Sequence, residues 1–232
     1  MLDVLRCRRP AFCSWLEKAA MLIVYAVPIS LYCAKLRIVL RHKGLTWRED
    51  PPPGGYGSED YKQIVPSGNL PALVDGELMI ADSEAIAEYL EEQHPIPAML
   101  PVNPTERAKV RERSRFHDTR LEPEVRALFP FLPGREVIAE EMLCKQSREI
   151  SKRLEQLAHM VDEAISPEST LTLGDSGFAI TFTWLDELTR LMGLEISWPK
   201  SLVSYRKWLE NQSAVKDELT EYGPKLATFL MG

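Results

Sequence analysis

Short apolar runs separated by turn residues mark the first half of the chain. Residues 22–27 (LIVYAV) are apolar and rich in β-branched side chains, which is typical of a buried central strand. Residues 31–43 carry apolar side chains three and four positions apart, which predicts an amphipathic helix. A second strand at residues 46–49 would complete a βαβ unit. The helix is expected to turn its basic residues outward, among them Lys35, Arg41 and Lys43.

A β-hairpin is predicted for residues 70–81. Asp75-Gly76 is a strong hairpin turn signal between two apolar runs. Pro71 opens the first run, at a position where a strand tolerates proline and where a cis X-Pro bond is favoured. A cis bond would turn the backbone N–H and C=O of Leu70 outward, so that they could pair with an extended ligand.

Asp82 and Ser83 stand where a helix at residues 84–93 should begin. The free N–H groups of a helix N-terminus bind anions, and a carboxylate binds ammonium. This corner therefore suits the zwitterionic end of an α-amino acid. The alternative is that the two residues only cap the helix.

The second half of the chain shows helical patterns and no convincing strand. A proline-rich connection at residues 95–104 predicts a domain boundary between an α/β domain (21–94) and an all-α helical bundle (105–232). Residues 1–20 have no clean period and are expected to be an extension without a functional role. The predicted helices span residues 105–128 with a break near Pro123, 136–165, 178–191, 202–210 and 215–222.

Composition and charge indicate which kinds of partner and which cellular compartment to expect. The 232 residues carry a net charge of −6, which argues against a nucleic-acid partner. No apolar run approaches the roughly 20 residues that a membrane span needs, so no membrane partner is expected. The four cysteines lack metal-binding or disulfide-framework spacing, which predicts no metal site and favours a reducing, cytoplasmic location.

The hairpin and the following helix resemble the glutathione-binding half of the glutathione transferase family. The matching residues are Leu70-Pro71-Ala72-Leu73, for the pattern x-(Val/Ile/Leu)-Pro-x-Leu, and residues 82–90, for (Glu/Asp)-Ser-x-Ala-Ile-x-x-Tyr-Leu. The resemblance implies a thioredoxin-like N-terminal domain with glutathione as co-substrate. It implies that Leu70 and the cis Pro71 meet the cysteinyl part of glutathione and that Asp82 and Ser83 hold its γ-glutamyl group. Asp82 keeps the charge of the glutamate that is usual there.

The glycine carboxylate of glutathione would lie near the polar residues before the hairpin. We favour Asn69, which directly precedes the Leu70-Pro71 pair, over Lys62 and Gln63. Residues 51–58 (PPPGGYGS) predict a surface loop that borders the site.

Ser30 is the candidate catalytic residue, because it stands at the start of the first helix. The N-terminus of a helix stabilises a thiolate, and a hydroxyl there can donate one more hydrogen bond to the sulfur. Theta- and zeta-like members of the family place a serine seven residues before an arginine, which matches Ser30 and Arg37. The resemblance thus implies that Ser30 activates the thiol, although it can also be a simple N-cap. Rival candidates are Tyr25, as a phenol activator, and Cys33, as a redox thiol.

The pocket for an electrophile is expected along the first long helix. The resemblance places Phe116, His117 and Arg120 there, and Phe129 and Phe131 follow. An aromatic cluster suits an apolar substrate, while core packing is the alternative for each side chain. Further along, Gly174-Asp175 matches the family, but its Ser-x-x-Asp capping box is replaced by residues 179–182. We expect Asp175, Ser176 or Thr181 to compensate.

The expected activity is conjugation of glutathione to an electrophilic, apolar small molecule by a cytosolic homodimer. Three other uses of the fold stay open. The first is glutathione-dependent isomerisation of maleyl acids, for which Arg120 is the only obvious cation, and the second is dehalogenation or ether cleavage. The third is a non-catalytic binding or scaffold protein. A thiol–disulfide reductase would instead require an exposed Cys33.

Overall fold

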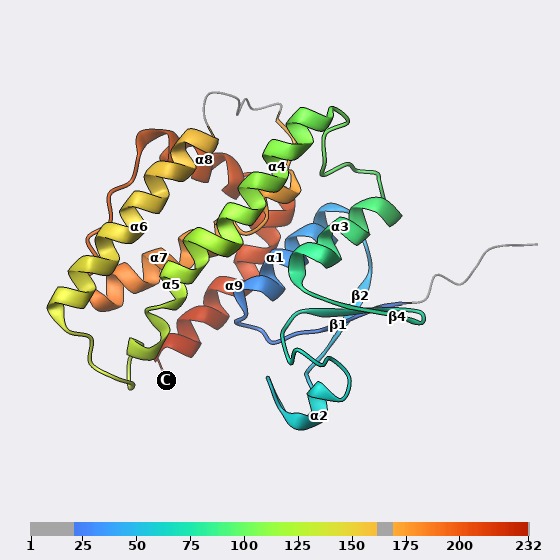
Figure 1. Cartoon of the computed structure of the whole chain (residues 1–232), viewed down its shortest axis with the longest axis horizontal. Coiled ribbons are helices and arrows are strands. Elements are labelled where there is room, and N and C mark those ends of the chain that lie inside the picture. The colour runs from blue at the N-terminus through green and yellow to red at the C-terminus, as the bar shows by residue number, and fades with distance from the viewer. Residues whose placement is uncertain (1–20, 162–168, 232) are drawn as a thin grey trace, which may run out of the picture.

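The computed structural model describes residues 21–161 and 169–231, so the prediction for residues 1–20 lies outside the described residues. The strands form one four-stranded sheet. In Figure 1 this sheet and its helices lie on one side of the molecule, and a helical region lies on the other. This arrangement confirms the predicted fold class, a thioredoxin-like N-terminal domain followed by a largely helical C-terminal part.

The sheet has the strand order β2-β1-β3-β4. Strands β1 (Leu22–Tyr25) and β2 (Trp47–Asp50) are parallel and are joined through helix α1 (Leu31–His42), which confirms the βαβ unit. Strands β3 (Ala72–Asp75) and β4 (Leu78–Ala81) form the predicted hairpin, and β3 runs antiparallel to β1. The Leu70–Pro71 bond directly before β3 is cis, as predicted, and Ile96–Pro97 is also cis.

Helices make up most of the remaining described residues. They are α2 (Glu59–Lys62), α3 (Ser83–Gln93), α4 (Pro104–Phe116), the π-helical turn η1 (His117–Leu121), α5 (Glu122–Arg126), α6 (Glu140–Met160), α7 (Phe178–Met192), α8 (Lys200–Glu210) and α9 (Ser213–Met231). Two single 3-10 turns are η2 (Phe129–Phe131) and η3 (Leu173–Asp175).

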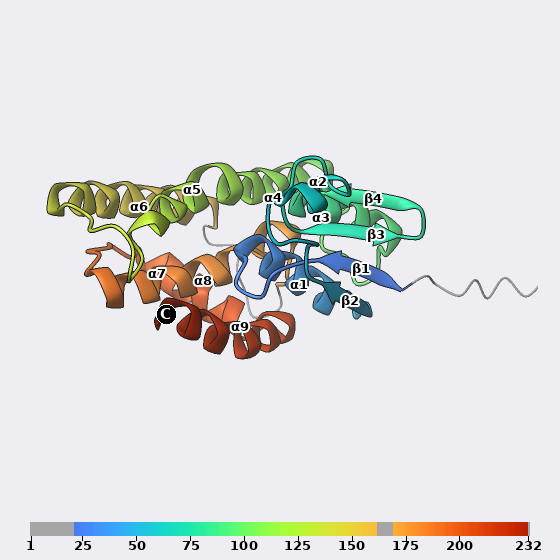
Figure 2. The same cartoon turned by 90° about the horizontal axis from the view of Figure 1, so that it is seen from below.

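Helix α1 is the central element between the sheet and the helical part (Figure 2), and it packs against α3, α7 and α9. The prediction that Lys35 and Lys43 face outward is wrong, because they are only 1% and 6% exposed. Their ammonium groups meet buried carboxylates, which compensate the cost of removing the charges from water.

Several helix boundaries also differ from the sequence patterns, such as the start of α6, which begins at Glu140 and not at residue 136. The irregularity predicted near Pro123 lies earlier, at η1, and Pro123 occupies the first turn of α5, where its missing N–H costs little. Helix α9 continues to Met231 through Pro224, beyond the predicted end at residue 222. The burial of Leu226 and Leu230 holds this last part in the core and outweighs the helix-breaking effect of Gly223-Pro224.

Candidate functional site

A cavity of about 960 Å³ lies between the N-terminal domain and the helices α4 and α5. Five of the six residues proposed for glutathione and its thiol line it: Ser30, Asn69, Leu70, Asp82 and Ser83. The sixth, Pro71, follows Leu70 through the cis bond. The cavity therefore brings together three segments that are far apart in the sequence. Its lining is completed by Val27, Ile29, Leu31, Tyr32, Tyr56, Ser67, Ala81, Arg115, Asp118, Thr119, Arg126 and Phe129.

Ser30 is the N-cap of α1 and also lines the cavity. Its Oγ accepts the N–H of Cys33 at 3.3 Å, with an extended backbone at φ −67° and ψ 124°. This bond uses a lone pair of the hydroxyl and not its proton, and the Ser30 side chain also counteracts the effect of burial on the pKa of the Cys33 thiol. One side chain can thus cap the helix and hydrogen-bond a thiolate at the same time.

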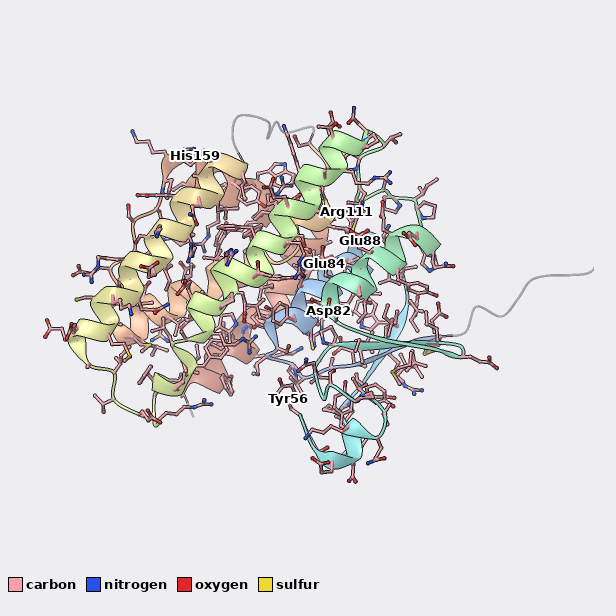
Figure 3. All side chains as sticks on the ribbon, viewed as in Figure 1. Tyr56, Asp82, Glu84, Glu88, Arg111 and His159 are labelled. Atoms are coloured by element: carbon pink, nitrogen blue, oxygen red, sulfur yellow. The ribbon has the colours of Figure 1, made fainter. Side chains whose placement is uncertain are left out.

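The start of α3 forms the second wall. Asp82 is the single non-glycine residue with positive φ among residues 21–161 and 169–231, at φ 86° and ψ 120°. Its Oδ1 accepts the N–H groups of Glu84 at 2.9 Å and Ala85 at 3.1 Å, so neither cap bond uses Oδ2. Strained backbone of this kind is concentrated at functional sites. Figure 3 shows Asp82 at the beginning of α3.

The third wall belongs to the helical part. Phe129 stacks on Trp184 with ring centroids 4.6 Å apart, and the guanidinium of Arg126 lies over the rings of both Tyr32 and Phe129. Arg115 is exposed and lies 3.8 Å from Asp118 Oδ2. This wall thus offers an aromatic surface with two cations beside it.

The acceptor residues expected from the sequence lie elsewhere. Phe116, His117 and Arg120 do not belong to the cavity lining. Phe116 is buried, Arg120 is exposed, and the imidazole of His117 bonds Asp118 and Thr181, each at 2.7 Å. Sequence reasoning missed Arg115, Thr119 and Arg126, although Arg115 and Thr119 stand four positions apart, as residues on one helical face do.

The rival activators are not placed to act on a ligand. Burial raises the pKa of the Cys33 thiol, and Cys33 is 1% exposed, which contradicts a reductase that needs this residue at the surface. Tyr25 packs edge-on against Tyr61 and does not line the cavity. The expected cap compensation is also wrong, since no side chain caps α7 and Asp175 instead bonds Thr172 in η3. The loop at residues 51–58 does border the cavity, through Tyr56.

Asp118 is the carboxylate that the helical part contributes to the cavity lining. Burial alone would raise its pKa, but the hydrogen bond from His117 and the charge of Lys35 lower it to about 2. Among the described residues, no group of three or more His, Cys, Asp or Glu side chains is arranged to hold a metal ion. Within the same residues, no helix has the length and apolar character needed to cross a membrane.

Comparison with known proteins finds glutathione transferases and proteins of related sequence. Residues 24–106 match the N-terminal domain of glutathione S-transferases. The chain is 28% identical to a stringent starvation protein A homolog of Coxiella burnetii over 88% of this chain and 94% of that protein. It is 34% identical to glutathione S-transferase Z2 of Arabidopsis thaliana over 55% of this chain and 62% of that protein.

Solved structures show the same fold. A Bombyx mori glutathione transferase superposes with a TM-score of 0.74 at 19% identity, and the match covers 90% of this chain and 98% of that one. An omega 3C glutathione transferase of Trametes versicolor gives a TM-score of 0.70 at 22% identity, over 85% of this chain and 88% of that one.

Proposed function

Since the chain belongs to the glutathione transferase family, we propose that it binds glutathione in the cavity and transfers its thiolate to an electrophilic small molecule. Glutathione lies extended along Leu70, with its γ-glutamyl zwitterion at Asp82 and Ser83. Asn69 is near its glycine carboxylate. We place the enzyme in the cytosol as a homodimer, as is usual for the family.

In the proposed reaction, Ser30 donates its hydroxyl proton to the sulfur of bound glutathione. This bond and the N-terminus of α1 stabilise the thiolate, so the thiol loses its proton to water near neutral pH. The thiolate then attacks the electrophilic carbon, a C–S bond forms, and the displaced group leaves with the bonding electron pair. The aromatic wall at Phe129 holds the acceptor against the sulfur.

One observation carries the proposal: four of the five residues expected to meet glutathione line a single cavity with Ser30. Because they come from three separate segments, no local folding requirement brings them together. A site built for an extended γ-glutamyl peptide accounts for their placement.

The test is isothermal titration of the protein with glutathione, followed by turnover of chlorodinitrobenzene. We expect binding by the wild type, clear weakening in Ser83→Ala, and no change in Ser176→Ala, a serine that is also buried but bonds Leu173 in η3. Binding without turnover of any electrophile would favour a non-catalytic binding protein. Absence of binding by the wild type would contradict the proposal.

A second candidate is supported by Arg115 and Arg126, which line the cavity where only Arg120 was expected to supply a cation. Two guanidinium groups suit an acceptor that carries carboxylates, such as a maleyl acid. In that case the thiolate would add to the double bond and leave again after rotation. Isomerisation of maleyl acids that is lost in Arg115→Ala would favour this activity over conjugation or dehalogenation.

A further inference from the structure

Lys35 is a buried lysine of α1 that the proposed reaction does not use. Its side chain is 1% exposed. Its Nζ donates to Glu84 Oε2 at 2.8 Å, to Ser114 Oγ at 3.2 Å and to Asp118 Oδ2 at 2.9 Å. An ammonium group has three donors, so these partners satisfy it completely.

Each partner of Lys35 lies at or beside a residue of the cavity lining. Glu84 follows Ser83, Ser114 precedes Arg115, and Asp118 itself lines the cavity. Lys35 in turn lies on α1, the helix that begins directly after Ser30. One ammonium group therefore joins four elements around the site, namely α1, α3, α4 and η1.

The cluster is charged as well as hydrogen-bonded. Burial alone would lower the pKa of Lys35, but the charges of Asp118 and Glu84 raise it. Ser114 Oγ donates to Glu84 Oε2 at 2.5 Å, and His117 Nδ1 bonds Asp118 Oδ1 at 2.7 Å. Because a carboxylate only accepts, this imidazole nitrogen carries the proton.

A second ion pair also joins α3 and α4. Arg111 meets Glu88 at 2.6 Å, and its side chain is 45% exposed. Figure 3 shows Glu84, Glu88 and Arg111 where α3 and α4 lie beside each other. The exposed pair contributes little to the placement of the helices, because water screens it. The buried contact at Lys35 fixes the geometry more strongly.

We propose that Lys35 is a positioning residue that sets the γ-glutamyl corner at Ser83 and the helical wall at Asp118 relative to Ser30. Its removal displaces the thiol of bound glutathione from the Ser30 hydroxyl. This inference rests on the proposed function for its main readout. A misplacement of about 1 Å from a distant change can cost on the order of 100-fold in rate.

Lys43 provides a matched control on the same helix. It is similarly buried, and its Nζ donates to Glu91 Oε2 at 2.6 Å and to the carbonyl groups of His94 and Pro97. None of these residues lines the cavity. Lys43→Met therefore removes the ammonium partner of a buried carboxylate, as Lys35→Met does, but at a site away from the cavity; Glu91 keeps the N–H groups of Met99 and Leu100, as Glu84 keeps the Ser114 hydroxyl.

The experiment compares Lys35→Met with Lys43→Met by glutathione titration and by the ultraviolet absorbance of the bound thiolate against pH. We expect Lys35→Met to weaken binding roughly 10- to 100-fold and to raise the pKa of the bound thiol. Lys43→Met should leave both values near those of the wild type. Equal effects of the two substitutions, or no effect of Lys35→Met, would overturn the inference.

Two milder substitutions keep the test decisive if Lys35→Met does not fold. Glu84→Gln and Ser114→Ala each weaken one contact of Lys35, and each should cause a smaller change of the same sign, whereas unchanged values would overturn the inference.

If the wild type does not bind glutathione, the proposed function fails, and amide hydrogen exchange then tests whether Lys35 positions the two segments. We expect the amides of residues 82–86 and 114–121 to exchange faster in Ser114→Ala than in the wild type, and not in Lys43→Met. Unchanged exchange in Ser114→Ala would overturn the inference.

Discussion

The hydroxyl group of Tyr32 donates a hydrogen bond to Glu122 Oε2 at 2.9 Å, from the first turn of α1 to the start of α5. Burial and the nearby carboxylate raise the pKa of Tyr32. Its proton is therefore held by Glu122 although its ring lines the cavity. Of the two hydroxyl groups at this end of α1, that of Tyr32 is thus bound to a carboxylate of the protein, which leaves Ser30 as the candidate donor to a ligand.

Tyr32→Phe should leave the pKa of the thiol of bound glutathione unchanged. The substitution removes the bond to Glu122 and should lower the free energy of unfolding by about 1–3 kcal/mol, since a buried carboxylate loses a donor. Thiolate absorbance and urea unfolding measure the two effects separately. A raised thiol pKa in this variant would make Tyr32 the activator in place of Ser30.

Gly177→Ala should destabilise the protein. A Cβ at position 177 would lie 2.4 Å from His117 Cε1, so the imidazole would have to leave its bonds to Asp118 and Thr181. We expect a loss of roughly 1–3 kcal/mol in thermal or urea unfolding. The control is Gly223→Ala in α9, where nothing lies within 4 Å of the added Cβ. Equal stability of the two variants would show that His117 is not packed as described.

Asp118→Asn should reduce the dependence of stability on pH in acid. The folded protein lowers the pKa of Asp118 from 3.8 to about 2, so its contribution is present above pH 4 and is lost as the pH falls to 2. This shift corresponds to on the order of 2 kcal/mol at pH 7. Urea unfolding from pH 2 to 7 should show the variant and the wild type converging in acid. The exposed Asp217→Asn serves as control, and parallel curves for wild type and Asp118→Asn would contradict the assignment.

Asp82 variants should separate the backbone role of this residue from its charge. Asp82→Asn keeps a cap acceptor and a side chain that tolerates positive φ, so its stability should stay near that of the wild type while glutathione binding weakens. Asp82→Ala loses the cap as well, at a cost of about 1 kcal/mol or more. Calorimetric unfolding and glutathione titration give the two values. Unchanged binding in Asp82→Asn would remove Asp82 from the γ-glutamyl site.

Local signals explain why the glutathione half could be predicted from the sequence. The turn at Asp75-Gly76, the cap at Asp82 and the cis bond before Pro71 depend on neighbouring residues, and the structure shows each of them. The burial of Lys35 could not be predicted in this way. Its carboxylate partners Glu84 and Asp118 lie 49 and 83 positions away, so the residue reads locally as solvent-facing.

The residues expected to meet the acceptor lie outside the cavity lining, next to a helical irregularity that the sequence does not predict. A π-helical turn contains one more residue than an α-helical turn, so the face that follows is rotated. Within η1, His117 is buried in the core, and Asp118 and Thr119 line the cavity. No residue pattern in the sequence indicates this turn, and the family resemblance placed Phe116, His117 and Arg120 at the pocket without it.

The central claim is that the Ser30 hydroxyl stabilises the thiolate of bound glutathione. It is tested most directly by the ultraviolet absorbance of that thiolate against pH in the wild type and in Ser30→Ala. Ser58→Ala is the matched control, because Ser58 caps α2 in the same way: its Oγ accepts the N–H of Tyr61, and Ser58 does not line the cavity. We predict a depressed thiol pKa in the wild type and in Ser58→Ala, and an ordinary one in Ser30→Ala, which still binds glutathione. The same depressed pKa in all three proteins would contradict the claim.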